Sequence, residues 1–150
     1  MQWERPARPG ARPEVICHYD LAPYNVIFDR TRPVGVIDLD NAGPGARVDD
    51  LAYFAYRFAP LSALENYFDG GWSHDVDRMP RLQRICELSP LEERTQIPEL
   101  VLRRLDEMRQ WIRDRAAEGD PAVQNHIGIY DADARYIERE HDNIRAILES

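Results

Sequence analysis

With 150 residues, 43% of them hydrophobic and 31% charged, the chain is long enough for one folded globular domain and too apolar for a disordered one. The net charge of −8 disfavours nucleic acid as a partner, because a polyanion is bound by clustered positive charge. No apolar run approaches the roughly 18 residues that span a bilayer, and the N-terminus has no signal-peptide core, so we expect a cytoplasmic protein without a membrane partner.

The first third of the chain has the pattern of short strands joined by turns. Residues 1–13 contain several prolines and no hydrophobic periodicity, so we expect an irregular leader there. Three apolar or β-branched runs follow at 14–17, 26–28 and 34–37. The polar residues 29–33 between the last two runs predict a hairpin loop.

The segment after the third strand is expected to lead through a loop into a helix. Residues 41–46 contain two glycines and a proline, which favour a loop over a regular element. Asp49 is a suitable N-cap for a helix over 50–58. Pro60 ends that helix, because the residue before a proline disfavours helical dihedral angles.

Two longer helices are expected in the second half of the chain. Ser89, Pro90 and Glu92 have the spacing of a capping box with a proline in the first turn, and Gly119 marks the end of the helix that follows. A last helix covers 132–148. The apolar positions on one face are Ile97, Val101, Leu105, Met108 and Ile112 in the first helix and Tyr136, Ile137, Ile144, Ile147 and Leu148 in the second. Short strands followed by helices predict an α+β protein that is mainly helical.

One stretch in the strand-rich part has the residue spacing of a kinase catalytic loop. His18, Asp20 and Asn25 form the pattern His-x-Asp-x-x-x-x-Asn, and Asp38 lies beyond a hairpin that would return it to the side of Asn25. Phosphoryl transfer needs a carboxylate that orients the attacking hydroxyl and accepts its proton, a role that suits Asp20. Asn25 and Asp38 offer the hard oxygen ligands that Mg²⁺ prefers.

This motif and its surroundings resemble the C-terminal lobe of the aminoglycoside phosphotransferase family, in the protein-kinase-like superfamily. The resemblance runs through residues 15–28, 36–40 and 49–52 and continues in the helical segment 102–121. It implies that 14–150 form such a lobe, in which a short β-hairpin carries the catalytic and metal-binding loops. It also implies transfer of a phosphoryl group from ATP or GTP, with Mg²⁺, to a hydroxyl of a small molecule, an aminoglycoside-like acceptor first of all.

The resemblance assigns a role to each residue of the motif. Asp20 is the catalytic base or hydroxyl-orienting residue, and Asn25 and Asp38 are the Mg²⁺ ligands. Asp50 matches an aspartate that braces the catalytic loop from the start of a helix. His18 matches a histidine of the loop whose role is mainly structural.

Two positions near the motif have no settled role. Asp40 matches an acidic residue that the family often shows two positions after the metal-binding aspartate, and both a structural hydrogen bond and a substrate contact remain open for it. Tyr19 stands where the family commonly has glycine, so the packing of the loop or the access of substrate is expected to differ.

A kinase of this type holds its nucleotide under a glycine-rich strand–turn–strand and pairs the phosphates with a lysine. All 19 basic residues of the chain are arginine, and few residues precede His18. We therefore expect the N-terminal lobe to be absent and the chain alone to be inactive. We also expect an exposed apolar patch where that lobe would dock, covered by an N-lobe polypeptide or by self-association. The arginine-rich, lysine-free composition is typical of a GC-rich bacterial gene.

Two other functions remain open from the sequence. The chain would act as a binding module if it is a truncated, non-catalytic remnant of the family. A metal hydrolase built on His18, Asp20, Asp38 and Asp40 is the other alternative, although it leaves Asn25 and the hairpin spacing unexplained.

Several side chains outside the motif are expected to be structural. Cys17 and Cys86 have neither a disulfide framework nor the spacing of a metal site, and Cys17 is interpreted as a small buried hydrophobic residue. The histidines His74, His126 and His141 are expected on the surface or in packing. The tryptophans Trp72 and Trp111 are expected in the core or at a lobe interface. A solvated helix face is expected for five acidic residues, with contact to a cationic substrate as the alternative: Glu92, Glu93, Glu99, Asp106 and Glu107.

Overall fold

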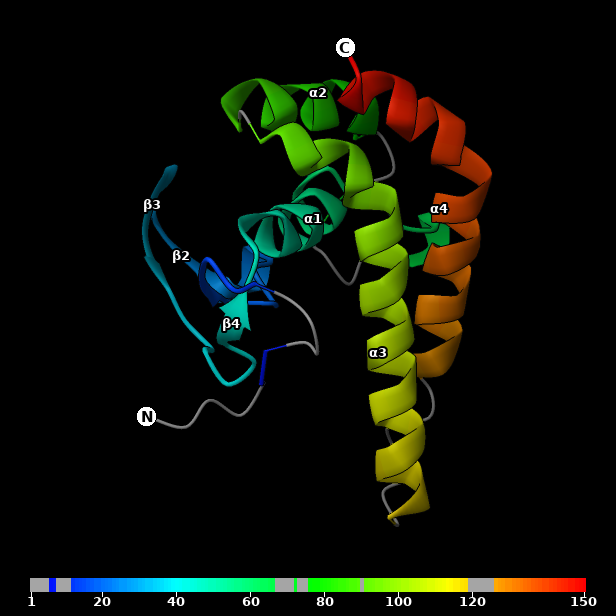
Figure 1. The fold of residues 1–150 in the computed structure, drawn as a ribbon. Helices are drawn as coiled ribbons and strands as arrows, with labels where there is room; N and C mark the ends of the chain where they lie inside the picture. The colour runs from blue at the N-terminus through cyan, green and yellow to red at the C-terminus, as the bar shows by residue number, and fades with distance from the viewer. Residues whose placement is uncertain (1–5, 8–11, 67–71, 73–75, 90, 119–125) are drawn as a thin grey trace.

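The computed structural model describes residues 6–7, 12–66, 72, 76–89, 91–118 and 126–150. In this part of the chain short strands lie on one side of the molecule and helices on the other (Figure 1). The strands are β1 (Val15–Cys17), β2 (Val26–Asp29), β3 (Arg32–Val36) and β4 (Gly43–Gly45), and the helices are α1 (Arg47–Phe58), α2 (Arg78–Leu88), α3 (Ile97–Ala117) and α4 (Ile127–Leu148). The prediction of a mainly helical α+β protein is confirmed.

The strands form two antiparallel pairs, β1 with β4 and β2 with β3. The loop predicted over 41–46 is wrong at its centre, because Gly43–Gly45 forms β4 and the backbone N–H of Glu14 donates to the oxygen of Gly45 at 2.9 Å. Pro44 is tolerated there because an edge strand is hydrogen-bonded on one side only. Both glycines are buried, so β4 can approach its neighbours closely.

The β2–β3 hairpin brings the chain back to the segment that precedes β2. The backbone N–H of Ile37 donates to the oxygen of Asn25 at 3.0 Å, so Asp38 follows directly after the partner of Asn25. The turn is shorter than the predicted loop. The turn consists of Arg30 and Thr31, since Asp29 pairs with Arg32, and Arg30 adopts the left-handed conformation with φ 57°.

Helix α1 begins earlier than predicted. Ala46 is the N-cap, and Asp49 lies at the third helical position rather than at the cap. The carboxylate of Asp49 instead reaches back to the backbone N–H of Ala46 at 3.2 Å and pairs with Arg103 of α3 at 3.0 Å. The helix ends at Phe58, as Pro60 predicts.

The long helices α3 and α4 lie side by side (Figure 1). The predicted N-cap of α3 is wrong: Ser89 ends α2, a 3-10 turn over Glu92–Gln96 follows, and Pro98 occupies the first turn of α3, where its missing N–H costs no hydrogen bond. Helix α4 begins at Ile127, five residues before the predicted start at 132. None of the described helices is long and apolar enough to cross a membrane.

The apolar faces predicted for the two long helices do form the core. Ile97, Val101, Leu105 and Ile112 of α3 are buried, and α4 buries Tyr136, Ile137, Ile144 and Leu148, whereas Met108 and Ile147 are partly buried at its edge. Three residues considered in the sequence lie outside the described residues: His74, and Pro90 and Gly119, on which the helix prediction depended.

One carboxylate is completely buried in this core. Asp133 of α4 accepts hydrogen bonds from the Tyr56 hydroxyl of α1, from the backbone N–H of Ala63 at 2.8 Å and from Nδ2 of Asn66 at 2.6 Å. Burial raises the pKa of Asp133 above its ordinary value of 3.8, against the opposing effect of these hydrogen bonds. The network ties α4 to α1 and to the segment after it.

Candidate functional site

The segment after β1 is held by the first turn of α1. The backbone N–H of His18 donates to Oδ2 of Asp50 at 2.8 Å, and the N–H of Tyr19 donates to Oδ1 of the same carboxylate at 2.8 Å. Hydrogen bonds to a charged acceptor are stronger than neutral ones, and a carboxylate in the first turn is also favoured by the helix dipole. Asp50 therefore ties the loop of His18 and Tyr19 to the first turn of α1.

The His18 ring links this loop to the end of the hairpin. Its Nε2 lies 2.9 Å from the backbone oxygen of Ile37, and the backbone N–H of Asp20 donates to its Nδ1 at 3.3 Å. These bonds fit the neutral tautomer with the proton on Nε2. Because both ring nitrogens have partners and the residue is buried, the arrangement favours a structural role over proton transfer.

The carboxylate of Asp20 is oriented by two neighbours. The Tyr24 hydroxyl donates to Oδ1 at 3.2 Å, and Nδ2 of Asn25 donates to Oδ2 at 3.1 Å and to the backbone oxygen of Asp20 at 2.9 Å. Asn25 is buried in a short 3-10 turn that begins at Pro23. Since its amide nitrogen is engaged by Asp20, its oxygen is the atom left to serve as a ligand.

The two downstream aspartates lie on the surface after β3. Asp38 is exposed and adopts φ 61°, a left-handed conformation that is uncommon outside glycine but that aspartate and asparagine adopt more often than most residues. Asp40 is also exposed, in a turn closed by the Ala42 N–H bonded to the oxygen of Leu39 at 2.9 Å. Among the described residues no three His, Cys, Asp or Glu side chains cluster as a metal site. Asn25 and Asp38 offer an amide and a carboxylate oxygen, the ligand types that hard cations prefer.

Tyr19, between the histidine and the aspartate of the motif, has an unusual backbone conformation. Its φ is 61°, which explains why a glycine suits this position. The side chain is 3% exposed, and its hydroxyl donates to the backbone oxygen of Pro44 at 3.1 Å. A Cβ at Gly45 would lie 2.1 Å from that hydroxyl oxygen and 2.9 Å from Sγ of Cys17. The tyrosine is therefore accommodated by a glycine on the neighbouring strand.

We expect Gly45→Ala to destabilise the protein by about 1–3 kcal/mol, the usual cost of overpacking a tightly packed site. The contacts with the Tyr19 ring are the larger source of that cost. In a Tyr19→Gly background the same alanine should therefore cost clearly less, as measured by urea unfolding of the four proteins of a double-mutant cycle. Equal costs in both backgrounds would contradict the assignment.

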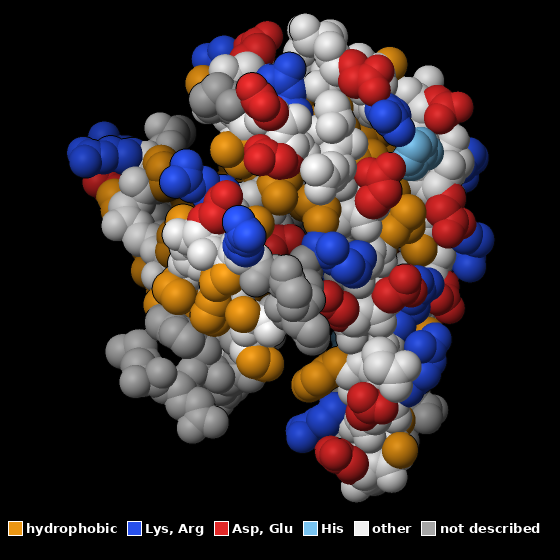
Figure 2. Space-filling model, in the orientation of Figure 1, with side chains coloured by type: hydrophobic (Ala, Val, Ile, Leu, Met, Phe, Trp, Pro, Cys, Tyr) orange, Lys and Arg blue, Asp and Glu red, His pale blue; other side chains and the backbone are white. Residues whose placement is uncertain are grey.

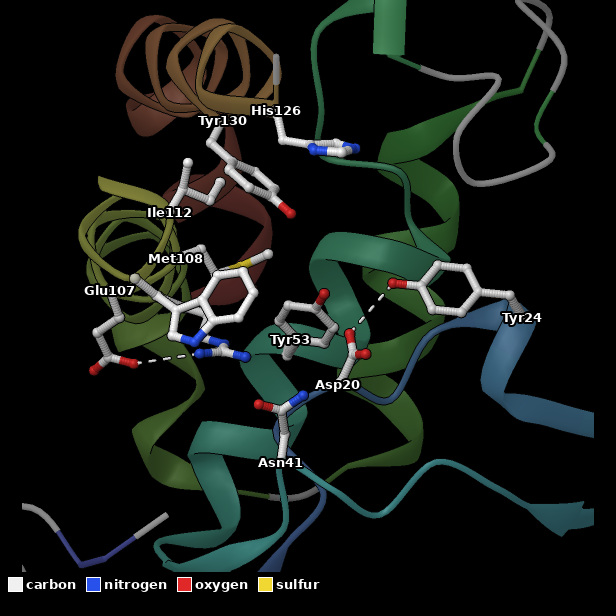
Figure 3. A pocket seen from close by; sticks show the side chains of 11 residues that line it. Asp20, Tyr24, Asn41, Tyr53, Glu107, Met108, Ile112, His126 and Tyr130 are labelled. Atoms are coloured by element: carbon white, nitrogen blue, oxygen red, sulfur yellow. Dashed lines mark hydrogen bonds and ion pairs between the residues drawn. The ribbon is translucent and has the colours of Figure 1, made fainter. Parts of the chain in front are cut away.

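A cavity of about 610 Å³ lies beside Asp20, between the loop, α1 and the two long helices (Figure 3). The side chains that line it are Asp20, Tyr24, Asn41, Tyr53, Arg104, Glu107, Met108, Trp111, Ile112, His126 and Tyr130. In Figure 3 the side chains of Asp20, Tyr53 and Tyr130 approach one shared space. Its size is that of a small-molecule site.

The cavity wall contains residues for which the sequence predicts other roles. Trp111 is 57% exposed and lines the cavity rather than lying in the core. Glu107, expected on a solvated helix face, is paired with Arg104 at 3.6 Å in that wall, and His126 joins it from the start of α4. Nothing in the sequence marks Tyr53 or Tyr130 as part of a site, because neither belongs to a motif.

The phenols of the wall are neutral at neutral pH, because their ordinary pKa is 10.0 and desolvation raises it further. The pKa of Tyr24 is raised, that of Tyr53 lies well above the ordinary value, and that of Tyr130 is raised to about 12. At neutral pH these groups act as hydrogen-bond donors and acceptors without charge. Outside the cavity, the burial of Cys17 raises the pKa of its thiol to about 12, which fits a structural cysteine.

The model of the phosphotransferase enzyme family matches residues 1–85. The chain belongs to that family. No curated protein and no solved structure matches it. In this member of the family the matched part contains every residue of the motif, whereas α3 and α4, which supply much of the cavity wall, lie beyond it. The family resembles the aminoglycoside phosphotransferases, and its activity implies a nucleotide and a metal in general terms.

Proposed function

We propose that the site is the catalytic part of a small-molecule kinase that uses ATP or GTP with Mg²⁺. The observation that carries the proposal is the position of Asp20: its carboxylate faces the cavity and is at the same time fixed by Asn25. Asp20 would orient the acceptor, and Asn25 and Asp38 would hold the metal. Family membership supports phosphoryl transfer.

In the proposed reaction the acceptor hydroxyl donates its hydrogen bond to Asp20 in place of Tyr24. The acceptor oxygen forms a bond to the γ-phosphorus of the nucleotide while the bond to the β-phosphate oxygen breaks, and Asp20 takes up the hydroxyl proton. Bound Mg²⁺ would neutralise negative charge on the phosphates. Asp50 and His18 keep the loop in place during the reaction through the bonds described above.

The hairpin carries an apolar surface that suits a partner. Figure 2 shows hydrophobic side chains gathered on the strand side of the molecule. The exposed residues are Ile27, Phe28, Val34, Val36, Ile37 and Leu39, each between 46% and 61% exposed. Surfaces of this kind mark interaction sites. We propose that a nucleotide-binding lobe, or a second copy of the chain, covers it.

The metal site is tested by thermal unfolding of the chain with and without Mg²⁺. We expect Mg²⁺ to raise the melting temperature, since a ligand that binds only the folded state stabilises it. Asp38→Ala should remove the shift, and Asn25→Ala should reduce it. Asp29 is an exposed aspartate at the end of β2, so Asp29→Ala is the control and should keep the shift. An unchanged shift in Asp38→Ala would refute the metal assignment.

Activity of the 150 residues alone is not part of the proposal, because the chain has no lysine to pair the nucleotide phosphates. In an assay with labelled ATP or GTP and a panel of alcohols, we expect the isolated chain to transfer no phosphate. Transfer that disappears in Asp20→Asn would show that the site is self-sufficient.

A further inference from the structure

The β2–β3 hairpin is exposed on both of its faces. Ile27 and Val36 belong to neighbouring pairs of the two strands, so their side chains lie on opposite faces of the two-stranded sheet. Their exposed fractions are 47% and 48%. A two-stranded sheet is only marginally stable in water by itself, because it buries little apolar area. The hairpin therefore gains stability when a partner covers it.

The two ends of the hairpin carry opposite charge. Arg30 and Arg32 lie at the turn beside Asp29, so the turn keeps a net positive charge. Asp38 and Asp40 follow β3 at the other end. All five side chains are exposed, and none of them forms an ion pair with another described residue. The charged groups at both ends are thus available to a second molecule.

This order of charges makes the hairpin complementary to a copy of itself that runs in the opposite direction. Figure 2 shows positive side chains at the free end of the hairpin and hydrophobic ones along it. In the antiparallel pair the arginines of each copy face the aspartates of the other, and the apolar middle parts meet. The same contacts form twice about a two-fold axis, as in most dimers. A parallel pair would instead bring like charges together.

We propose that a second copy of the chain covers this hairpin, in a two-fold dimer whose hairpins run in opposite directions. The inference goes beyond the proposed kinase function and does not depend on it, because it uses neither the cavity nor bound metal. Pro33 has no N–H, which disfavours strand addition at the edge of β3, so the apolar side chains make the contact. The dimer covers the surface that a nucleotide-binding lobe would need, so the two partners exclude each other.

Sedimentation velocity of the full chain tests the proposal. The buffer contains EDTA, because Asp38 is also a proposed Mg²⁺ ligand. We expect an equilibrium between monomer and dimer with a dissociation constant of roughly 1–100 µM, since a contact made by one hairpin is small. A chain that stays monomeric at roughly 500 µM would overturn the proposal. So would open-ended association without a defined dimer, because a two-fold contact closes at two copies.

Charge-reversed variants test the orientation. Arg30→Asp with Arg32→Asp makes both ends of the hairpin acidic, and Asp38→Asn with Asp40→Arg leaves positive charge at both ends. Aspartate and asparagine are used at 30 and 38 because both positions have a left-handed backbone. Each double variant should dimerise at least roughly tenfold more weakly than the wild type.

An equimolar mixture of the two double variants should form a mixed dimer, because each end then meets the opposite charge. This gain on mixing also shows that both variants are folded. Dimers of either variant alone that are as strong as those of the wild type, or a mixture that remains monomeric, would contradict the antiparallel arrangement.

A matched pair of variants tests the apolar part of the contact. Val34 of β3 is 56% exposed and Leu88 of α2 is 68% exposed, and aspartate at either position changes the net charge equally. Val34→Asp enters the contact twice and should weaken the dimer at least roughly tenfold, whereas Leu88→Asp should leave it unchanged. A dimer unaffected by Val34→Asp, or lost in Leu88→Asp, would place the contact elsewhere and refute the proposal. The metal-shift experiment decides the proposed function separately, since it measures Mg²⁺ binding and not association.

Discussion

Asp133→Ala is expected to destabilise the protein by roughly 3–5 kcal/mol, a large part of the stability of a small domain. The substitution removes the acceptor of three buried donors, on Tyr56, Ala63 and Asn66. Each donor left without a partner costs about 1–3 kcal/mol, from which the relief of burying a charge is subtracted. Urea unfolding followed by circular dichroism measures the change. A loss below about 1 kcal/mol would contradict the role of the network.

Asp133→Asn is the matched control, because the asparagine can keep every hydrogen bond. Its oxygen accepts from Ala63 and Asn66, and its amide donates to the Tyr56 hydroxyl, which can turn to accept. We expect Asp133→Asn to change the free energy of unfolding at neutral pH by much less than Asp133→Ala does.

We expect the stability of the wild type and the stability of Asp133→Asn to depend differently on pH. Because the folded pKa of Asp133 is raised, the folded wild type binds its proton more tightly than the unfolded chain does. The stability contributed by this proton is complete below the unfolded pKa near 3.8 and is lost as the pH rises through the folded pKa. The asparagine of the variant carries no such proton, so the stability of Asp133→Asn relative to wild type should increase with pH across that window. A constant difference would contradict the raised pKa.

Asp50→Ala is expected to release the loop that follows β1 and to cost about 2–4 kcal/mol, since two hydrogen bonds to a charged acceptor are lost. The N–H groups of His18 and Tyr19 lose their acceptor together. Hydrogen exchange should therefore show that both amides lose protection, while amides in the middle of α3 keep theirs. The Mg²⁺ shift in melting temperature should fall as well, because the loop carries Asn25.

Asp50→Asn retains one acceptor oxygen and should lie between the alanine variant and the wild type in stability and in amide protection. Asp29→Ala, on an exposed side chain, serves as the control. Unchanged protection of His18 and Tyr19 in Asp50→Ala would mean that the loop is held by other contacts.

The sequence predicts best those features that depend on neighbouring residues. The position of Asp20 and Asn25 on one loop depends on residues five positions apart, and the apolar spacing of α3 depends on that helix alone. The bracing contact of Asp50 with the loop could be expected only through the resemblance to a family, because it links residues more than thirty positions apart.

Features that depend on residues far apart in the sequence could not be predicted from local patterns. The Gly43–Gly45 segment looks like a loop until β1 is present to pair with it. The cavity has the same origin, since Tyr53 and Tyr130 come from different helices and meet only through the packing of the core. The N-cap prediction for α1 is wrong for a local reason. A carboxylate at the third helical position can bond to the backbone N–H of the cap residue, so its presence does not identify the cap itself.

The close approach of Tyr19 and Gly45 also limits the order in which substitutions at these two positions can be introduced. With a tyrosine at 19, any side chain at 45 enters the space of the ring, whereas a glycine at 19 leaves that space open. A variant that passes through a larger residue at 45 first meets both the Tyr19 ring and Sγ of Cys17, whereas one that changes 19 first meets only the contact with Cys17. Libraries that redesign this loop will therefore recover substitutions at 45 mainly in combination with a smaller residue at 19.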